Sequence, residues 1–388
     1  MSCACCPVCG ADRARPVITL DAVPVLCNQL WPDTASARAA PHATLALTIC
    51  EACGHLWNTA FEPDRVTYDP SYESSLHHSA AFRAFADGLA RRLVEAHGLR
   101  GARVVEMGSG QGDFLARLVA AGMARATGFD PSFRGNAAPG VTIHATLFDP
   151  EMTEERGDLV LSRHVLEHLA DLRGALAALL SALDPDGARA VYVEVPNALW
   201  TLTEGGVWDL IYEHVSYFTP ASLRRLAAEI GLLHIEITPC FGGQYLSLDA
   251  RAGAPPVARP VGGAEVAGLV AAADAFAAQV ETMRRDWAAR LADWRGEGRQ
   301  IVLWGAGAKG VTFLNIVEGT GAIGHVVDIS PDKRGRYVPG AGHRIEGPEE
   351  MAQAARGPIE VIAMNPLYRD EIALRLAALG VAARLHAP

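Results

Sequence analysis

The sequence predicts a multidomain α/β protein in which a cysteine-bearing segment precedes two Rossmann-like units. Three observations predict this architecture. Two matching Cys-x-x-Cys-Gly motifs lie before residue 55, strand and helix patterns alternate over about residues 101–250, and a second strand–glycine–helix pattern starts at Ile301. The 388 residues, half of them hydrophobic, are enough for two or three buried cores. We therefore predict domains at residues 1–65, 66–255 and 256–388.

The composition excludes several classes of partner. The formal net charge is −10, which disfavours nucleic acid because phosphate binding requires a basic surface. No stretch of about eighteen uncharged apolar residues is present, so we expect no membrane span. Residues 1–6 have neither the basic region nor the apolar run of a secretion signal. We expect a cytoplasmic monomer that acts on a small molecule.

Seven of the eight cysteines lie before residue 54, a distribution that suits a metal site better than a set of disulfides. The two C-x-x-C-G motifs, at residues 6–10 and 50–54, can each direct two thiolates at one ion, and together they complete a tetrahedral site with no open position. The predicted ligands of this structural zinc site are Cys6, Cys9, Cys50 and Cys53. Cys3 and Cys5 leave the register of the first motif open, whereas Cys27 is expected to be a small buried hydrophobe.

Glycine recurs at every second position after the apolar run Val104–Val105 and an acid. The pattern predicts a strand, a tight turn and the start of a helix, and glycine lets the backbone approach a ligand closely. The motif consists of Glu106, Gly108, Gly110 and Gly112. Asp130 ends the next apolar run, where an acid can accept hydrogen bonds from both hydroxyls of a ribose. The alternative is a glycine-rich turn that binds no ligand.

The spacing E-x-G-x-G-x-G differs from the G-x-G-x-x-G of dinucleotide-binding proteins. It resembles motif I of the class I S-adenosylmethionine (SAM) methyltransferases, which implies a Rossmann-like fold with SAM as cofactor. In such folds an acid near the position of Asp149 often contacts the adenine amino group. The alternative for Asp149 is a solvated loop residue before Pro150.

The remaining elements of this unit follow in order. A tyrosine-rich loop precedes a helix over about residues 80–97, in which apolar positions recur every three or four residues. Strands are predicted at residues 103–107, 126–130, 158–162, 190–195 and 233–237. This alternation indicates a mostly parallel sheet with helices on both faces, whose ligands bind beyond the carboxyl ends of the strands.

A linker is predicted over residues 252–263, before a long helix over about residues 264–297. Apolar residues recur every seven positions along this helix, which predicts a packing face. Beyond the helix, Gly305–Gly310 matches G-x-G-x-x-G and Asp328 ends the following strand. On pattern alone this second unit is a dinucleotide fingerprint, so a nicotinamide-dependent oxidoreductase is an alternative.

The order of these parts, together with the segment Trp208–Phe218, resembles the three-domain SAM-dependent C-methyltransferases of deoxysugar biosynthesis. That family acts on nucleotide-linked keto sugars, and the resemblance covers nearly the whole chain. It implies a zinc-binding N-terminal domain, a SAM-binding central domain and a Rossmann-like C-terminal domain, and it makes NAD binding at Gly305–Gly310 the less favoured interpretation. Lys309 and Lys333 could then help to hold the diphosphate of the substrate.

The resemblance also implies roles for individual residues. Glu213 and His214 align with the Glu-His pair of the family, and Tyr72 and His168 match its tyrosine and histidine near the substrate. His164 competes with His168 for that position. The family usually has a tyrosine two residues before the Glu-His pair, where this chain has Ile211, and this departure puts the substrate in doubt.

Methyl transfer from SAM to carbon requires a carbanion-like nucleophile, which a base can form beside a ketone. His214 is the candidate base because a neutral imidazole suits proton removal near neutral pH, and Glu213 can orient a sugar hydroxyl. Two alternatives stay open. The first is N-, O- or C-methylation of a metabolite that is not a sugar, and the second is an assembly protein that recruits a partner through its zinc domain.

Overall fold

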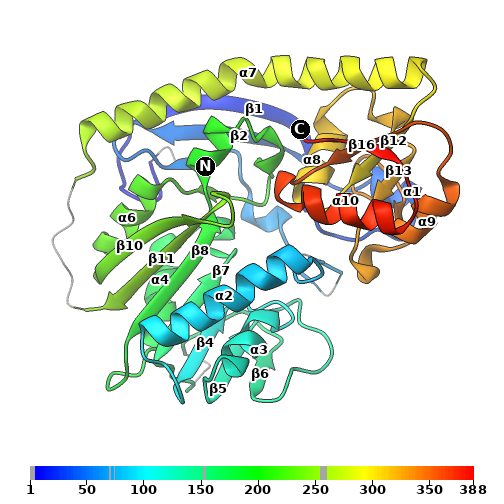
Figure 1. The fold of residues 1–388 in the computed structure, drawn as a ribbon. Coiled ribbons are helices and arrows are strands. Elements are labelled where there is room, and N and C mark those ends of the chain that lie inside the picture. Colours follow the sequence, from blue (N-terminus) through cyan, green and yellow to red (C-terminus); the bar gives the residue numbers. More distant parts are fainter. Residues whose placement is uncertain (1–4, 70, 74, 152–153, 254–259) are drawn as a thin grey trace.

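The computed structural model describes residues 5–69, 71–73, 75–151, 154–253 and 260–388, which form three sheets of four, seven and five strands. The long helix α7 (Gly263–Gly296) runs across the top of the molecule in Figure 1, over β1 of the N-terminal sheet and on toward the C-terminal domain. The predicted linker lies mostly outside the described residues, because residues 254–259 are not among them.

The N-terminal sheet is antiparallel and combines segments that are far apart in the sequence. Its strands, in spatial order, are β1 (Ala14–Pro24), β2 (His42–Cys50), β3 (Leu56–Asn58) and β9 (Ser216–Tyr217). The first three follow one another closely, with helix α1 (Thr34–Arg38) between β1 and β2. Because β9 pairs with β3, the cysteine-bearing segment is joined directly to residues that follow Glu213 and His214.

The central sheet has the order β10-β11-β8-β7-β4-β5-β6. Its strands are β4 (Arg103–Met107), β5 (Arg125–Phe129), β6 (Val141–His144), β7 (Leu159–Arg163), β8 (Ala190–Pro196), β10 (Leu232–Cys240) and β11 (Tyr245–Ala252). The pairs from β8 to β6 are parallel, whereas β11 is antiparallel to both of its neighbours. All five predicted strands are present, and β6 and β11 are additional.

Helices cover both faces of the central sheet, as predicted. Their bounds are α2 (Ala80–Ala96), α3 (Asp113–Ala120), α4 (Leu172–Ser181) and α6 (Pro220–Glu229), whereas the short helix α5 (Ala198–Thr203) packs in the core that α7 shares with the N-terminal sheet. Buried residues of α2 and α3 form one core with β4, β5 and β7, and residues of α4 and α6 form another core on the opposite face. The glycine motif and the segments after β7 and β8 therefore meet at the carboxyl edge of the parallel strands.

Helix α7 packs through the predicted apolar stripe. Leu269, Phe276 and Trp287 are at most 7% exposed and belong to one core with β1, β2 and the C-terminal strand β12 (Gln300–Trp304). This is the one helix among the described residues that is long and apolar enough to cross a membrane. Because its apolar residues are buried against other parts of the same chain, we interpret α7 as a core helix.

The C-terminal domain has a parallel sheet of order β14-β13-β12-β15-β16. Its strands are β12 (Gln300–Trp304), β13 (His325–Val327), β14 (Ile345–Glu346), β15 (Ile359–Ala363) and β16 (Ala383–His386), and its helices are α8 (Ala308–Ile316), α9 (Pro348–Ala354) and α10 (Arg369–Ala378). Gly305–Gly310 follows β12 directly and includes the first residues of α8, which is the Rossmann-like arrangement that the second glycine motif predicts.

The C-terminal domain is held to the central domain by specific polar contacts. Glu371 of α10 accepts hydrogen bonds from the Ser79 hydroxyl (2.7 Å) and from the backbone N–H groups of Ala80 and Ala81 (3.2 and 3.3 Å), so it caps the start of α2. The amide side chains of Gln244 and Asn365 hydrogen-bond to each other in both directions, at 2.9 and 3.0 Å.

Candidate active site

The four predicted zinc ligands converge. The sulfurs of Cys6, Cys9, Cys50 and Cys53 all lie within 4.8 Å of one another, and the pairs Cys6–Cys53 and Cys9–Cys50 are each 3.6 Å apart. A tetrahedral zinc ion with Zn–S bonds of about 2.3 Å holds its sulfurs roughly 3.8 Å apart. The set therefore fits a structural zinc ion, as predicted. Cys5 is exposed and Cys27 is buried outside the cluster, while Cys3 lies outside the described residues.

Each cysteine motif forms the same tight turn. Gly10 N–H donates to the Cys6 carbonyl at 2.9 Å, and Gly54 N–H donates to the Cys50 carbonyl at 2.8 Å. Both glycines have a φ of about +70° (+71° and +72°), which residues with a Cβ adopt only at a cost. The glycine in each motif therefore allows the turn that brings its two sulfurs to one side.

The central glycine motif forms the loop between β4 and α3. A Cβ at Gly108 would lie 2.1 Å from Cγ2 of Val165, so this glycine lets the loop pack against the segment that follows β7. A Cβ at Gly110 would meet no atom within 4 Å, and the φ of this glycine is +54°. The loop is thus packed at its first glycine and open at its second, which is the arrangement that close approach of a ligand requires.

Glu106 supplies the clearest test of whether this loop fits SAM. Its carboxylate is buried, and its Oε2 has no hydrogen-bond partner. Burial raises its pKa to about 8, although the positive charge of Arg163 opposes the shift. A buried carboxylate oxygen without a partner is costly unless a donor or a cation reaches it, so the residues fit a ligand that carries positive charge, as SAM does.

Asp130 and Asp149 occupy different environments. Asp130 accepts hydrogen bonds from Gly110 N–H (2.8 Å), Ser132 N–H (2.8 Å) and the Ser132 hydroxyl (2.6 Å), so it stabilises the glycine loop. Asp149 is exposed and accepts from Glu151 N–H at 2.9 Å, as a loop acid does when it caps its own turn. The structure brings Asp130 to the glycine loop, and Phe148, the residue before Asp149, packs on Phe129 at the end of β5 with ring centroids 5.1 Å apart.

Glu213 is the centre of a second cluster. Its side chain is fully buried, and Oε1 accepts from the backbone N–H of Cys27 at 2.9 Å. Oε2 accepts from the hydroxyls of Tyr72 (2.8 Å) and Tyr68 (3.3 Å). Burial raises the pKa of Glu213 to about 7, and these three donors limit the shift because they stabilise the charged form.

His168 and His214 lie side by side next to this carboxylate, with ring centroids 4.7 Å apart. His168 Nδ1 is 2.8 Å from the Tyr68 hydroxyl and 3.2 Å from the Glu213 carbonyl. His214 Nδ1 is buried and has no partner. Burial lowers the pKa of His168 to about 4 and that of His214 well below its usual range, and the neighbouring His168 adds to the effect on His214. Both imidazoles are therefore neutral at pH 7.

Backbone contacts hold this cluster beside the glycine loop. The 3₁₀ turn Leu166–His168 follows β7 directly after Val165, the residue that packs on Gly108. Val215 N–H donates to the Glu167 carbonyl at 2.8 Å, and Asn58 N–H of β3 donates to the Val215 carbonyl at 2.9 Å. The segment with Glu213 and His214 is thus fixed between the strand-end turn and the N-terminal sheet.

His164 belongs to a neighbouring buried network. Its Nε2 lies 3.0 Å from Oε1 of Glu194, and its φ of +55° turns the chain away from the strand direction. Arg163 donates to the same Oε1 from Nε (3.1 Å) and Nη2 (2.6 Å), and Tyr192 donates to Oε2 at 2.8 Å. Of the two competing histidines, His168 is therefore the one that lies beside Glu213 and His214.

The cluster around Glu213 contains two residues that the sequence did not predict as site residues, Tyr68 and Glu167. The adjacent Tyr212 lies outside it. Tyr68 contacts both His168 and Glu213, and Glu167 lies buried in the cluster with an unpartnered Oε2. Tyr212 points away, because its hydroxyl accepts from Glu62 N–H at 2.8 Å. The tyrosine-rich loop was a sequence signal for Tyr68, whereas nothing in the sequence separated Glu167 from an ordinary helix-start acid.

Comparison with known proteins agrees with this geometry. Residues 77–236 match a family model described as a methyltransferase domain, and residues 263–382 match one described as a C-methyltransferase C-terminal domain. The chain is a SAM-dependent methyltransferase with a C-methyltransferase C-terminal domain. It is 28% identical to C-methyltransferase NovU of Streptomyces niveus over 392 residues, which cover 95% of this chain and 90% of the relative.

Solved structures overlap with part of this C-methyltransferase. The magnesium protoporphyrin IX methyltransferase of Synechocystis PCC 6803, with bound SAH, is 21% identical at a TM-score of 0.35 and covers 45% of this chain and 84% of its own. The N-methyltransferase NodS of Bradyrhizobium japonicum WM9, in complex with SAH, is 19% identical at a TM-score of 0.34 and covers 45% and 88%. Each overlap includes less than half of this chain.

Side chains of the C-terminal domain hold the second glycine motif, Gly305–Gly310, in place. Asp328 Oδ2 accepts from Ala306 N–H at 2.9 Å, and Lys333 donates to the Ala306 carbonyl at 3.2 Å. Lys309 pairs with Asp209 of the central domain, and its ammonium lies 5.0 Å from the centre of the Trp200 ring. Both lysines therefore have protein partners, and Lys309 connects the C-terminal domain to the segment that leads to Glu213.

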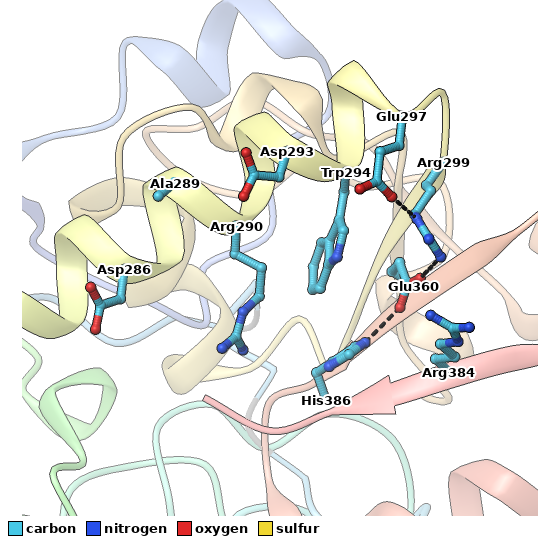
Figure 2. A pocket seen from close by; sticks show the side chains of 10 residues that line it. All are labelled: Asp286, Ala289, Arg290, Asp293, Trp294, Glu297, Arg299, Glu360, Arg384 and His386. Atoms are coloured by element: carbon cyan, nitrogen blue, oxygen red, sulfur yellow. Dashed lines mark hydrogen bonds and ion pairs between the residues drawn. The ribbon is translucent and has the colours of Figure 1, made fainter.

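A polar pocket of about 450 Å³ lies away from this site, between α7 and the strands β15 and β16. Figure 2 shows Glu360 at its base, bonded to Arg299 on one side and to His386 on the other. These contacts measure 2.5 and 2.6 Å, and Glu360 is 1% exposed. The buried carboxylate is thus satisfied by its neighbours, and we interpret the group as a structural ion-pair network.

Proposed function

We propose that the enzyme methylates a carbon atom of a nucleotide-linked keto-deoxysugar through an enolate intermediate, with His214 as the base. The observation that carries this proposal is the cluster around Glu213. It brings Tyr72, His168, Glu213 and His214 from three separate segments to the glycine loop of the central domain. The proposal is also supported by the match of residues 263–382 to a C-methyltransferase C-terminal domain.

Proton removal is the step that the protein has to promote. A neutral imidazole with a free nitrogen can take a proton from the carbon next to a ketone, and His214 has a buried Nδ1 without a partner. The electron pair of the broken C–H bond then forms the new C–C bond, and the proton stays on His214. Removal of such a base typically lowers the rate by roughly 10²- to 10⁴-fold.

The hydroxyl groups of Tyr68 and Tyr72 fix the position of the Glu213 carboxylate, because each donates its one proton to Oε2. Tyr68 and Tyr72 stay protonated because burial raises the pKa of both phenols well above the usual value, and the charge of Glu213 adds to this effect. They hold the carboxylate of Glu213 in place, and a fixed donor or acceptor stabilises a transition state without having to reorganise. We expect Glu213 to orient a sugar hydroxyl.

The cofactor supplies a methyl group on a positively charged sulfur, which is the electrophile for this reaction. Glu106, the backbone at Gly110 and the carboxylate of Asp130 are the groups that we expect to hold it. Asp149 remains a proposed adenine contact, and it would have to act from its exposed position after β6.

The proposal also names a class of substrate, the nucleotide-linked sugars. Lys309 lies between the C-terminal domain and the segment that carries Glu213, where a cation can attract a diphosphate. Because Lys309 is paired with Asp209, the substrate would have to compete with that carboxylate. The alternative is a SAM-dependent methyltransferase that acts on a non-sugar metabolite. Titration with a sugar nucleotide separates the two, because the alternative predicts no binding.

His214→Gln tests the base directly. We expect turnover to fall by roughly 10²- to 10⁴-fold, while the dissociation constant for SAM stays within about threefold, because the ring of His214 packs on His168 and Tyr217. His234→Gln, a change at an exposed position of β10, is the matched control and should keep full turnover. Undiminished turnover in His214→Gln would exclude His214 as the base.

A further inference from the structure

Three side chains of the active-site cluster have the geometry of a metal site. Glu167, His168 and His214 each offer one ligand atom, and these atoms lie within 4.8 Å of one another. Among the residues that the structure describes, the four cysteines are the other group of this kind. The set differs from the cysteine site in donor type, because it consists of two imidazoles and a carboxylate.

Two atoms of the set lack the partners that buried polar atoms need. Glu167 is 1% exposed and its Oε2 has no hydrogen-bond partner, and His214 Nδ1 is likewise buried without one. Buried polar atoms without a partner are rare in folded proteins, and they commonly mark a bound water, a bound ion or a catalytic role. Two of them in one three-residue cluster point to a shared ligand.

The surroundings of His168 match those of a metal-binding histidine. Its Nδ1 lies 3.2 Å from the Glu213 carbonyl and 2.8 Å from the Tyr68 hydroxyl, so Nε2 is left available for a ligand. Histidines that bind metals usually hold the ring in this way, through a carbonyl or carboxylate at the second nitrogen. Two imidazoles with one carboxylate form a common donor set for divalent transition metals.

We propose that Glu167, His168 and His214 bind one divalent transition-metal ion of the Zn²⁺ or Co²⁺ type in the substrate-free enzyme, and that this ion inhibits methyl transfer. The inhibition rests on the proposed function, because an ion on His214 occupies the nitrogen that would accept the substrate proton. Burial raises the pKa of Glu167 to about 8, so a dication that binds to this carboxylate and the two neutral imidazoles displaces the Glu167 proton.

Co²⁺ titration of the full-length enzyme tests the binding. The protein keeps its cysteine-bound zinc, and neither SAM nor acceptor is present. We expect one Co²⁺ per chain in addition to the zinc, by metal analysis, with visible d–d absorption and without the sulfur-to-cobalt charge-transfer bands of thiolate ligands. No additional ion, or an ion with thiolate bands, would overturn the proposal and leave an ordered water as the ligand of the cluster.

Substitutions locate the ion. Glu167→Gln and His214→Ala should each weaken Co²⁺ binding by at least about tenfold, in line with the losses that follow even from outer-shell changes. Glu236→Gln and His234→Gln, two exposed positions of β10, should bind the ion as the unmodified enzyme does. Equal binding by all four variants would overturn the proposal, and circular dichroism shows whether each variant is folded.

Turnover is measured separately, so the two proposals can fail independently. The rate of methyl transfer should fall as the second ion binds, and it should recover when EDTA removes that ion but not the zinc. Full activity with the ion bound would overturn the inhibitory role. Turnover that survives in His214→Ala would refute the base, whereas the Co²⁺ absorption of the unmodified enzyme would still report the metal site.

Discussion

Glu106 and Glu194 are two buried carboxylates near the same arginine, and their partners give them opposite pKa shifts. Burial opposes the charge of both. Glu194 receives direct hydrogen bonds from Arg163 and Tyr192, and the charge of Arg163 lowers its pKa to about 2. Glu106 lacks such bonds at Oε2, and burial raises its pKa to about 8. Glu194 is therefore satisfied within the fold, whereas Glu106 keeps an oxygen without a partner, which we propose faces a cationic ligand.

Glu106 predicts a pH dependence of SAM binding. In the free protein Glu106 is mostly protonated below pH 8, and a bound cation favours the carboxylate, so binding should release a proton. From pH 6 to 8 the affinity should rise by up to about tenfold per pH unit and then level off. Calorimetry in buffers with different ionisation enthalpies measures the proton release.

Glu106→Gln provides the comparison for that experiment. Glutamine cannot ionise, so the variant should bind SAM more weakly at pH 8 and should show no proton release. Affinity that is independent of pH between 6 and 8 in the unmodified enzyme would contradict the role given to Glu106.

At the scale of residues, the sequence predicted which residue types form the site better than it distinguished between candidates that are close together in the chain. The glycine spacing identified Glu106 because a strand and a tight turn leave that side chain at the strand end. The choice between His164 and His168 depended on a left-handed φ at His164 and on the 3₁₀ turn Leu166–His168, which no local pattern indicates. Glu167 was missed because its environment comes from Val215, far along the chain.

At the scale of elements, β3 links the zinc site to the active site. Cys50 ends β2 and Cys53 lies in the turn before β3, while β3 pairs with β9 just after His214. The Asn58 side chain also donates to the Tyr212 carbonyl at 3.3 Å. The zinc site therefore supports the strand that holds Glu213 and His214 against the turn after β7.

Cys50→Ser tests this link. Structural zinc contributes directly to folding, so zinc loss should loosen β2 and β3 and, through β9, the segment Tyr212–Tyr217. A displacement of catalytic groups by about 1 Å can cost roughly 100-fold in rate, and we expect a loss of that size. SAM affinity should change by less than about threefold, because the glycine loop lies on the central sheet.

Hydrogen exchange with metal analysis measures the effect of Cys50→Ser. Protection should be lost over residues 42–58 and 212–217 and retained over residues 103–107. Cys5→Ser, at the exposed neighbouring cysteine, is the control and should keep both zinc and activity. Full turnover by a zinc-free Cys50→Ser protein would contradict the link.

Buried strands were easier to predict from the sequence than exposed or very short ones. Strands β4, β7 and β8 are buried along most of their length, and their continuous apolar runs predicted them. Strand β6 is a half-exposed edge strand of four residues, and its mixed sequence gave no such run. The two-residue strand β9 exists only because β3 pairs with it, which is tertiary information.

At the scale of the whole molecule, the C-terminal domain is tied to the central domain at several separate points. Glu371 caps α2, Gln244 pairs with Asn365, and Lys309 pairs with Asp209. In Figure 1 helix α10 lies on the side of the N-terminal end of α2, as the contacts of Glu371 require. The domain order was predictable from the motifs, whereas these contacts join residues 100 or more positions apart and were not.

Glu371→Gln tests the importance of this cap. A carboxylate at a helix start interacts favourably with the exposed N–H groups and the helix dipole. Its loss should cost about 1 kcal/mol, which lowers the exchange protection of the first turn of α2 by roughly fivefold. Asp370→Asn, at the exposed adjacent residue, should leave the protection unchanged. Equal protection in both variants would show that Glu371 does not hold the two domains together.

The central claim is C-methylation of a nucleotide-linked keto sugar, and one labelling experiment tests it most directly. The enzyme is incubated with SAM that carries a ¹³C methyl group and with a dTDP-4-keto-6-deoxyhexose, and carbon NMR records the product. A new signal in the C–CH₃ region is the predicted result. A signal in the O–CH₃ or N–CH₃ region would contradict the enolate mechanism, and no transfer despite confirmed SAM binding would contradict the proposed substrate class.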